Sequence, residues 1–212
     1  MKTVLCYGDS LTWGYDAETV SRHALADRWP SVLQAALGSG VNVIAEGLNG
    51  RTTAFDDYLA DADRNGVRLL PTLLATHTPV DLVIIMLGAN DMKPFISGYA
   101  YGSKQGMERL VDIARRHVDV FAAIPPQVLV VSPPPQSATA DADFAAMFDG
   151  GIAESRKLAG LYREVADANG CGFFDAGTVA ATTPLDGVHL DAANTRAIGT
   201  ALAPIVRQML GL

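Results

Sequence analysis

The sequence Thr3-Val4-Leu5-Cys6-Tyr7-Gly8-Asp9-Ser10-Leu11-Thr12-Trp13-Gly14 decides the fold of this chain. Its first five residues suit a buried strand and run directly into Gly-Asp-Ser, where the apolar pattern stops. A serine at the end of such a strand, beside a glycine that frees the backbone, points its hydroxyl off the sheet edge. Because ligands of open α/β sheets collect at the carboxyl ends of the strands, Ser10 is a candidate nucleophile. Taken alone, the same residues also suit an ordinary strand-to-loop turn.

A second candidate block precedes a predicted final amphipathic helix and reads Leu185-Asp186-Gly187-Val188-His189-Leu190-Asp191. A serine hydroxyl is a weak nucleophile until a base takes its proton, and histidine suits that role at neutral pH. An aspartate three residues earlier can hold the imidazole in one tautomer. Among the four histidines, only His189 has a carboxylate at that position. We therefore predict His189 as the base and Asp186 as the residue that orients it.

Two internal blocks offer hydrogen-bond donors. Residues 43–53 are a strand that leaves into a loop containing Gly50, and residues 81–91 are a buried strand that ends in Gly-Ala-Asn-Asp. Acyl transfer requires donors where negative charge develops on the carbonyl oxygen. The backbone N–H groups of Ser10 and Gly50 and the side-chain amide of Asn90 can supply three. Asn and Gly also end strands in many proteins, but four such blocks in this order are far less expected by chance.

The four blocks together resemble those of the SGNH (GDSL-type) hydrolases over nearly the whole chain. They are Gly8-Asp9-Ser10, Gly50, Gly88-x-Asn90-Asp91 and Asp186-x-x-His189. Three longer motifs are similar to those of a narrower branch, the bacterial arylesterases and acyltransferases. They are Gly-Asp-Ser-Leu-Thr-Trp-Gly, Gly-Leu-x-x-Arg-Thr-Thr and Val-Ser-Pro-Pro-Pro. The resemblance implies that Ser10 is the nucleophile, His189 the general base and Asp186 its orienter. It also implies an oxyanion hole of Ser10, Gly50 and Asn90 in a three-layer α/β/α, flavodoxin-like fold.

Length and composition favour one α/β domain over residues 1–212. A hydrophobic content of 49% with 18% charged residues is typical of a globular protein. The net charge of −7 and the lack of a Lys/Arg cluster argue against a nucleic-acid partner. No stretch approaches the roughly 20 apolar residues of a membrane span, and no leader pattern precedes the strand that carries Ser10. We therefore expect a cytoplasmic protein with no membrane partner.

The sequence predicts neither a metal nor a cofactor. No Cys/His cluster has the spacing of metal ligands, and there is no Gly-x-x-x-x-Gly-Lys phosphate loop. Cys6 is a rival nucleophile by its position near Ser10, but strand alternation directs it into a face of the sheet, and we interpret it and Cys171 as core residues. Four aspartates lack the glycine and terminal glutamate of a calcium loop and are interpreted as a solvated surface: Asp56, Asp57, Asp61 and Asp63.

Strand and helix patterns alternate along the chain, which predicts about five parallel strands with helices on both faces. One helix is expected to bury apolar positions from Met107 to Phe121, and the polar residues 15–27 are expected to face solvent. Two long connections, 92–106 and 133–151, are expected to rise beside Ser10. They hold residues of the kind enriched at interfaces, Phe95, Ile96, Tyr99, Tyr101, Phe144, Met147 and Phe148. These side chains are expected to line the substrate pocket, to cover their own core or to contact a second subunit, and we expect a homo-oligomer.

The leading hypothesis is a serine esterase that forms an acyl-enzyme on Ser10. Its predicted partner is a small-molecule ester with a short-chain or aryl group, and acyl transfer to alcohols is expected beside hydrolysis. A carbohydrate or lipid deacylase is the second hypothesis, because the fold alone does not choose the substrate. A non-catalytic α/β binding module is the third. The joint presence of Ser10, Asn90, Asp186 and His189 argues against it, because binding alone requires no such set.

Overall fold

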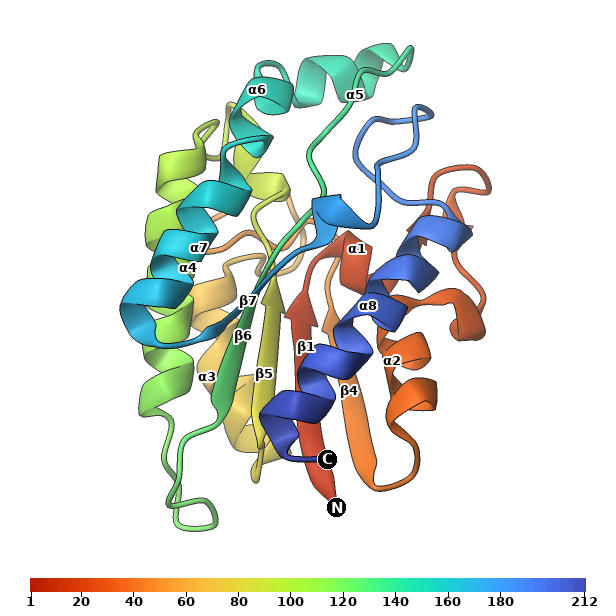
Figure 1. Ribbon diagram of the computed structural model, residues 1–212. Coiled ribbons are helices and arrows are strands. Elements are labelled where there is room, and N and C mark those ends of the chain that lie inside the picture. Colours follow the sequence, from red (N-terminus) through yellow and green to blue (C-terminus); the bar gives the residue numbers. More distant parts are fainter.

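The computed structural model describes residues 1–212, with a parallel sheet between two layers of helices (Figure 1). The sheet has five strands in the order β4-β1-β5-β6-β7. Their bounds are β1 (Lys2–Gly8), β4 (Val41–Gly47), β5 (Leu82–Met86), β6 (Gln127–Ser132) and β7 (Gly172–Asp175). All neighbouring pairs are parallel, so the predicted fold class is confirmed. The strand order reverses direction next to β1, and such a point is where open α/β sheets bind ligands.

Alternation along the strands builds a separate apolar core on each face of the sheet. In β1, Leu5 and Tyr7 belong to one core and Val4 and Cys6 to the other. The first core packs under α3 (Gly66–His77), α4 (Ala100–Arg116) and α7 (Leu158–Asn169). The second packs under α2 (Trp29–Leu37) and α8 (Ala192–Leu210). Both faces are therefore covered, as the continuous apolar runs of buried parallel strands require.

Short elements gather at the carboxyl ends of the strands, where Figure 1 shows α1, α5 and α6, and both chain termini lie at the opposite end. The helical ones are α1 (Ser10–Trp13), α5 (Ala142–Met147) and α6 (Gly151–Ser155). A two-stranded ribbon pairs β2 (Tyr15–Asp16) with β3 (Ser21–Arg22), and 3-10 turns span Leu25–Asp27, Asn90–Met92 and Ala176–Thr178. No helix is both long enough and apolar enough to cross a membrane.

Two predicted boundaries around α4 are wrong. The helix ends at Arg116, and Val118 and Phe121 are exposed in the turn that follows. The residues after Arg116 belong to the turn that leads to β6, where they keep the apolar spacing without being buried. The connection predicted over 92–106 is also shorter, because α4 begins at Ala100. Glycines in its first turns, which lower helix propensity, make this part of the sequence look like a loop.

Candidate active site

Ser10, His189 and Asp186 come together at the carboxyl edge of the sheet. Ser10 is the first residue of α1, and only Asp9 separates it from the end of β1. Its Oγ lies 2.9 Å from Nε2 of His189, and Nδ1 of the same ring lies 2.6 Å from Oδ2 of Asp186. Because a carboxylate can only accept, Nδ1 carries the proton, and Nε2 is left to accept the Ser10 hydroxyl. All three side chains are buried, so little water competes for these bonds.

The loop between β7 and α8 fixes the Asp186 carboxylate. Its Oδ1 accepts from the backbone N–H groups of Val188 and His189, at 2.9 Å each. Burial alone would raise the pKa of this carboxyl, but the hydrogen bonds and charge of His189 and the backbone N–H bonds lower it below its usual value. Asp186 is therefore ionised at neutral pH and holds the imidazole in one orientation.

Gly8 allows the sharp turn from β1 into α1. A Cβ at this position would overlap the side chain of Thr12 and the backbone carbonyl of Met86. Asp9 then caps α1, because its Oδ1 accepts from the N–H of Leu11 at 2.9 Å. The Gly-Asp-Ser order thus has a local reason that is independent of the chemistry: glycine for space, aspartate for the cap, and serine at the start of the helix.

Three hydrogen-bond donors lie around Ser10. The backbone N–H groups of Ser10 and Gly50 have no hydrogen-bond partner within the protein. Gly50 has a φ of 81°, a conformation that glycine adopts without strain. The Nδ2 of Asn90 donates to the carbonyl of Arg51 at 3.2 Å and lies 3.5 Å from Oδ2 of Asp9. All three predicted oxyanion donors therefore lie at the ends of the adjacent strands β1, β4 and β5.

Arg51 and the pair of Thr53 with Asp91 position these donors. The Arg51 guanidinium is buried against the ring of Tyr7, and its Nη1 donates to the carbonyls of Gly8, at 2.8 Å, and Glu46. The Thr53 N–H and hydroxyl both donate to the buried Asp91 carboxylate, the former at 2.9 Å. These contacts tie the Gly50 loop to β1, to β4 and to the turn that carries Asn90.

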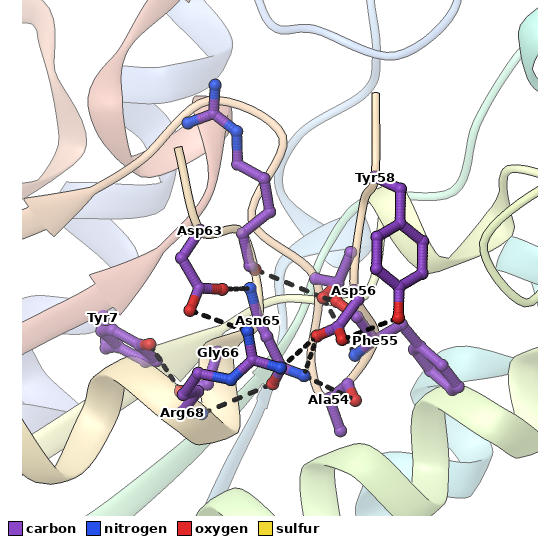
Figure 2. A network of polar contacts seen from close by, with 11 residues as sticks. Tyr7, Ala54, Phe55, Asp56, Tyr58, Asp63, Asn65, Gly66 and Arg68 are labelled. Carbon is purple, nitrogen blue, oxygen red and sulfur yellow. Dashed lines mark hydrogen bonds and ion pairs between the residues drawn. The ribbon is translucent and has the colours of Figure 1, made fainter. Parts of the chain in front are cut away.

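In the acidic segment between the Gly50 loop and α3, two of the four aspartates pair with one arginine (Figure 2). Arg68 contacts Asp56 at 2.6 Å and Asp63 at 2.9 Å, and Asn65 Nδ2 donates to Asp56 at 2.8 Å. From the sheet, the Tyr7 hydroxyl donates to the Gly66 carbonyl at 2.7 Å. These bonds give Asp56 and Asp63 a structural role in closing the loop.

A cavity of about 180 Å³ opens over Ser10. Its polar lining is formed by Ser10, Asn49, Gly50, Asn90, Lys93 and His189. Its other lining residues are Tyr15, Phe144, Met147, Phe148 and Val188. The connection over 133–151 therefore covers the site, as predicted. Phe95, Tyr99 and Tyr101 do not line this cavity and are exposed. A larger groove of about 460 Å³ shares Phe144, Phe148 and Val188 with the cavity.

The expectation that residues 15–27 face solvent is wrong for two side chains. Tyr15 packs on the ring of His189 with 4.2 Å between centroids. His23 is buried, and its Nε2–H donates to the carbonyl of Leu190 at 2.9 Å. Tyr15 lies in β2 and His23 directly follows β3, and neither position has a sequence signal. Cys6, in contrast, is fully buried within the sheet, where burial raises the pKa of its thiol, and it does not line the cavity.

An α/β/α protein in which serine, histidine and aspartate meet beside free N–H donors has the architecture of an ester hydrolase. The sequence pattern of the GDSL-like lipase/acylhydrolase family matches residues 6–197. The chain belongs to this family and is a carboxylic ester hydrolase.

Solved structures extend this comparison over the full chain. A carbohydrate acetylesterase family member from Sinorhizobium meliloti is 65% identical, with 100% of both chains covered and a TM-score of 0.98. The native aryl esterase of M. smegmatis is 42% identical, with 99% of this chain and 100% of that chain covered and a TM-score of 0.93. A second carbohydrate acetylesterase from Sinorhizobium meliloti is 41% identical, with 99% and 100% covered and a TM-score of 0.92. A search of curated proteins gave no match.

Proposed function

We propose that this protein hydrolyses small carboxylic esters through an acyl-enzyme on Ser10. The observation that carries the proposal is the unbroken series of hydrogen bonds from Ser10 Oγ to His189 and from His189 to Asp186, at 2.9 and 2.6 Å. A serine whose proton has a base within hydrogen-bond reach, and whose base has its own orienting group, is equipped for nucleophilic attack.

The reaction begins when Ser10 Oγ attacks the ester carbonyl and His189 Nε2 takes the hydroxyl proton. Asp186 stabilises the imidazolium that forms. His189 then returns the proton to the leaving alcohol as the tetrahedral intermediate collapses to the acyl-enzyme. A water molecule, deprotonated by the same imidazole, attacks the acyl group, and the acid is released with Ser10 restored.

The free N–H groups of Ser10 and Gly50 are suited to bind the negative oxygen of each tetrahedral intermediate. Asn90 adds a third donor. Its amide carries two protons, of which the Arg51 carbonyl accepts one. The other has only the long 3.5 Å contact to Asp9 and is available to the substrate oxygen.

A short acyl group fits the site best. The cavity over Ser10 has about 180 Å³ and is closed on one side by Phe144, Met147 and Phe148, which leaves little room for a long chain. The named relatives agree with this size, since one is an aryl esterase and two carry the name carbohydrate acetylesterase. The apolar wall also limits water near the acyl-enzyme, so we include transfer of the acyl group to alcohols in the proposal.

A carbohydrate acetyl ester is the second candidate substrate. It is favoured by the relative at 65% identity and by the groove beside the catalytic loop. That groove holds polar side chains, among them Gln136, Thr139 and Arg156, next to the phenylalanine wall. A hydroxylated alcohol could lie there while its acetyl group occupies the smaller cavity.

A substrate panel tests both candidates. We expect rapid hydrolysis of 4-nitrophenyl acetate, much slower hydrolysis of 4-nitrophenyl palmitate, and labelling of Ser10 by a fluorophosphonate. Comparison of phenyl acetate with acetylated xylose ranks the aryl and carbohydrate esters by kcat/KM. Absence of turnover on every acetyl ester, or a label on another residue, would contradict the proposal.

A further inference from the structure

Lys93 is a buried cation in the wall of the catalytic cavity. It follows Asn90 by three residues, and its backbone N–H donates to the Asn90 carbonyl at 3.3 Å. The oxyanion donor and the lysine therefore belong to one turn, and both side chains line the cavity with Ser10. Lys93 is only 9% exposed.

The Lys93 ammonium group has no polar partner in the protein. The chain has four lysines, and each of the other three, at positions 2, 104 and 157, forms a salt bridge. Lys93 Nζ forms neither a salt bridge nor a hydrogen bond. Its nearest described contacts are the rings of Phe148, at 5.5 Å, and Phe95, at 5.9 Å. Both distances are close to the outer limit of about 6 Å for a cation–π interaction, and they leave the three N–H donors unused.

The Lys93 side chain is largely buried, but its Nζ is not among the fully buried atoms that lack a partner, so the ammonium group reaches the cavity. A charge so poorly exposed to water is unfavourable without a hydrogen-bonded partner. Burial lowers the pKa of Lys93, and the charge of Arg64 acts in the same direction, while the carboxylates of Asp57 and Asp9 raise it. An anionic group inside the cavity would complete the site, because it would supply the partner that the protein does not.

We propose that Lys93 determines specificity by binding an anionic oxygen, best a carboxylate, carried by the substrate in addition to the ester. This inference rests on the proposed function, since it concerns the same cavity. The enzyme then favours acidic esters over neutral esters of the same shape, because only the former pair with the ammonium group. The anion can belong to the alcohol part or to the acyl part, and the experiment separates the two.

The first experiment compares matched substrates. On the alcohol side, kcat/KM is measured for 4-acetoxybenzoate and for neutral 4-acetoxybenzamide. On the acyl side, 4-nitrophenyl hydrogen succinate is compared with 4-nitrophenyl butyrate, after subtraction of spontaneous hydrolysis. In at least one pair we expect Lys93→Met to lower the ratio of anionic to neutral kcat/KM by about 10- to 100-fold, the size of a charged hydrogen bond.

Two further variants control this result. Lys93→Arg keeps the charge and should retain most of the preference for the anion. Lys104→Met removes a half-buried lysine that pairs with Glu164 and does not line the cavity, and it should leave both ratios as in the wild type. If Lys93→Met does not fold, Lys93→Gln takes its place. Equal ratios in the wild type and in the neutral Lys93 variant, for both pairs, would overturn the inference.

A binding measurement separates this inference from the proposed function. Calorimetric titration of Ser10→Ala with 4-acetoxybenzoate and with 4-hydroxybenzoate needs no turnover. We expect binding that weakens about 10- to 100-fold when Lys93→Met is added. If the double variant binds both carboxylates as Ser10→Ala does, Lys93 has no such role, whereas activity that survives in Ser10→Ala would contradict only the proposed function.

Discussion

The Nε2 atom of His189 lies 2.9 Å from Oγ of Ser10, although 179 positions separate the two residues in the chain. The contact exists because the loop before α8 lies against the carboxyl end of β1. A second hydrogen bond holds this loop in position, because His23 donates to the carbonyl of Leu190, the residue after His189. The Ser10–His189 contact therefore requires the complete fold. A substitution that breaks only this contact should lower the hydrolysis rate with little change in the free energy of unfolding.

Ser10→Ala should abolish ester hydrolysis while the fold remains. Loss of the nucleophile in a serine hydrolase costs on the order of 10⁴ to 10⁶ in rate, and the Ser10 hydroxyl faces the cavity instead of the core. The measurement is 4-nitrophenyl acetate turnover, with circular dichroism as the check on folding. Ser39→Ala, an exposed serine after α2, is the matched control. A folded Ser10→Ala with a tenth of the wild-type rate would rule out Ser10 as nucleophile.

Asp186→Asn should lower kcat by about 10⁴, the effect of the same change in a serine protease. The amide oxygen can still accept from the N–H groups of Val188 and His189, so the loop should keep its shape. The amide nitrogen would then face Nδ1 of His189 and favour the tautomer that cannot accept the Ser10 proton. Stopped-flow and steady-state rates test this, and an unchanged kcat would exclude Asp186 from the catalytic machinery.

Asn90→Ala should lower kcat by roughly 10²- to 10³-fold with a much smaller change in KM. The Asn90 amide is proposed to bind charge that exists only in the transition state, so ground-state binding should change little. Asn42→Ala, on the exposed side of β4, is the control. If instead KM rises and kcat stays constant, Asn90 binds the ground state and does not belong to the oxyanion hole.

Much of the fold and most of the polar site could be predicted from the sequence, for a physical reason. Parallel strands buried on both faces leave long apolar runs, and the residues that end them must meet at one sheet edge. Ser10, Gly50 and Asn90 each follow such a run. His189 could be identified because Asp186 precedes it at a fixed spacing within one loop.

The remaining parts of the site depend on contacts that leave no periodic pattern. Tyr15 and His23 lie in a polar stretch, and only the folded chain brings them against His189 and Leu190. The aromatic residues after Asn90 were expected to line the pocket. In the structure Lys93 lines the cavity, whereas Phe95 does not. The apolar spacing also continues past Arg116, although the helix ends there.

Asp9→Asn should change how stability depends on pH. Burial raises the pKa of the Asp9 carboxyl from 3.8 to about 6. Between these values the folded state binds more protons than the unfolded state, so Asp9 lowers the free energy of unfolding as the pH rises. The loss is complete above about pH 6 and amounts to about 3 kcal/mol. Asparagine does not titrate. The free energy of unfolding of the variant should therefore rise by this amount relative to that of the wild type between pH 4 and pH 7.

Urea unfolding at several pH values measures the Asp9 effect. Because other groups titrate in both proteins, the difference between variant and wild type is the quantity to follow. Asp167→Asn, at an exposed position of α7, is the control, and its stability should follow the pH dependence of the wild type. A variant-to-wild-type difference that is flat from pH 4 to pH 7 would show that the folded state does not hold a proton on Asp9.

The last prediction is that the protein forms a homo-oligomer through the surface around Phe95, Tyr99 and Tyr101. These side chains are 53%, 68% and 62% exposed, and aromatic residues are enriched at interfaces. They lie on the segment that follows Asn90, so a second subunit there would restrict access to the catalytic cavity. We expect light scattering at micromolar concentration to give a multiple of the chain mass, and Tyr99→Ser/Tyr101→Ser to reduce this mass.

With vinyl acetate and benzyl alcohol, the same double variant should yield less benzyl acetate relative to acetate, because water reaches the acyl-enzyme more freely. Val120→Ser/Phe121→Ser alters an even more exposed apolar turn, the one between α4 and β6, and should change neither mass nor products. A wild-type monomer, or dissociation by the second double variant only, would show that the aromatic surface beside the active site is not the interface.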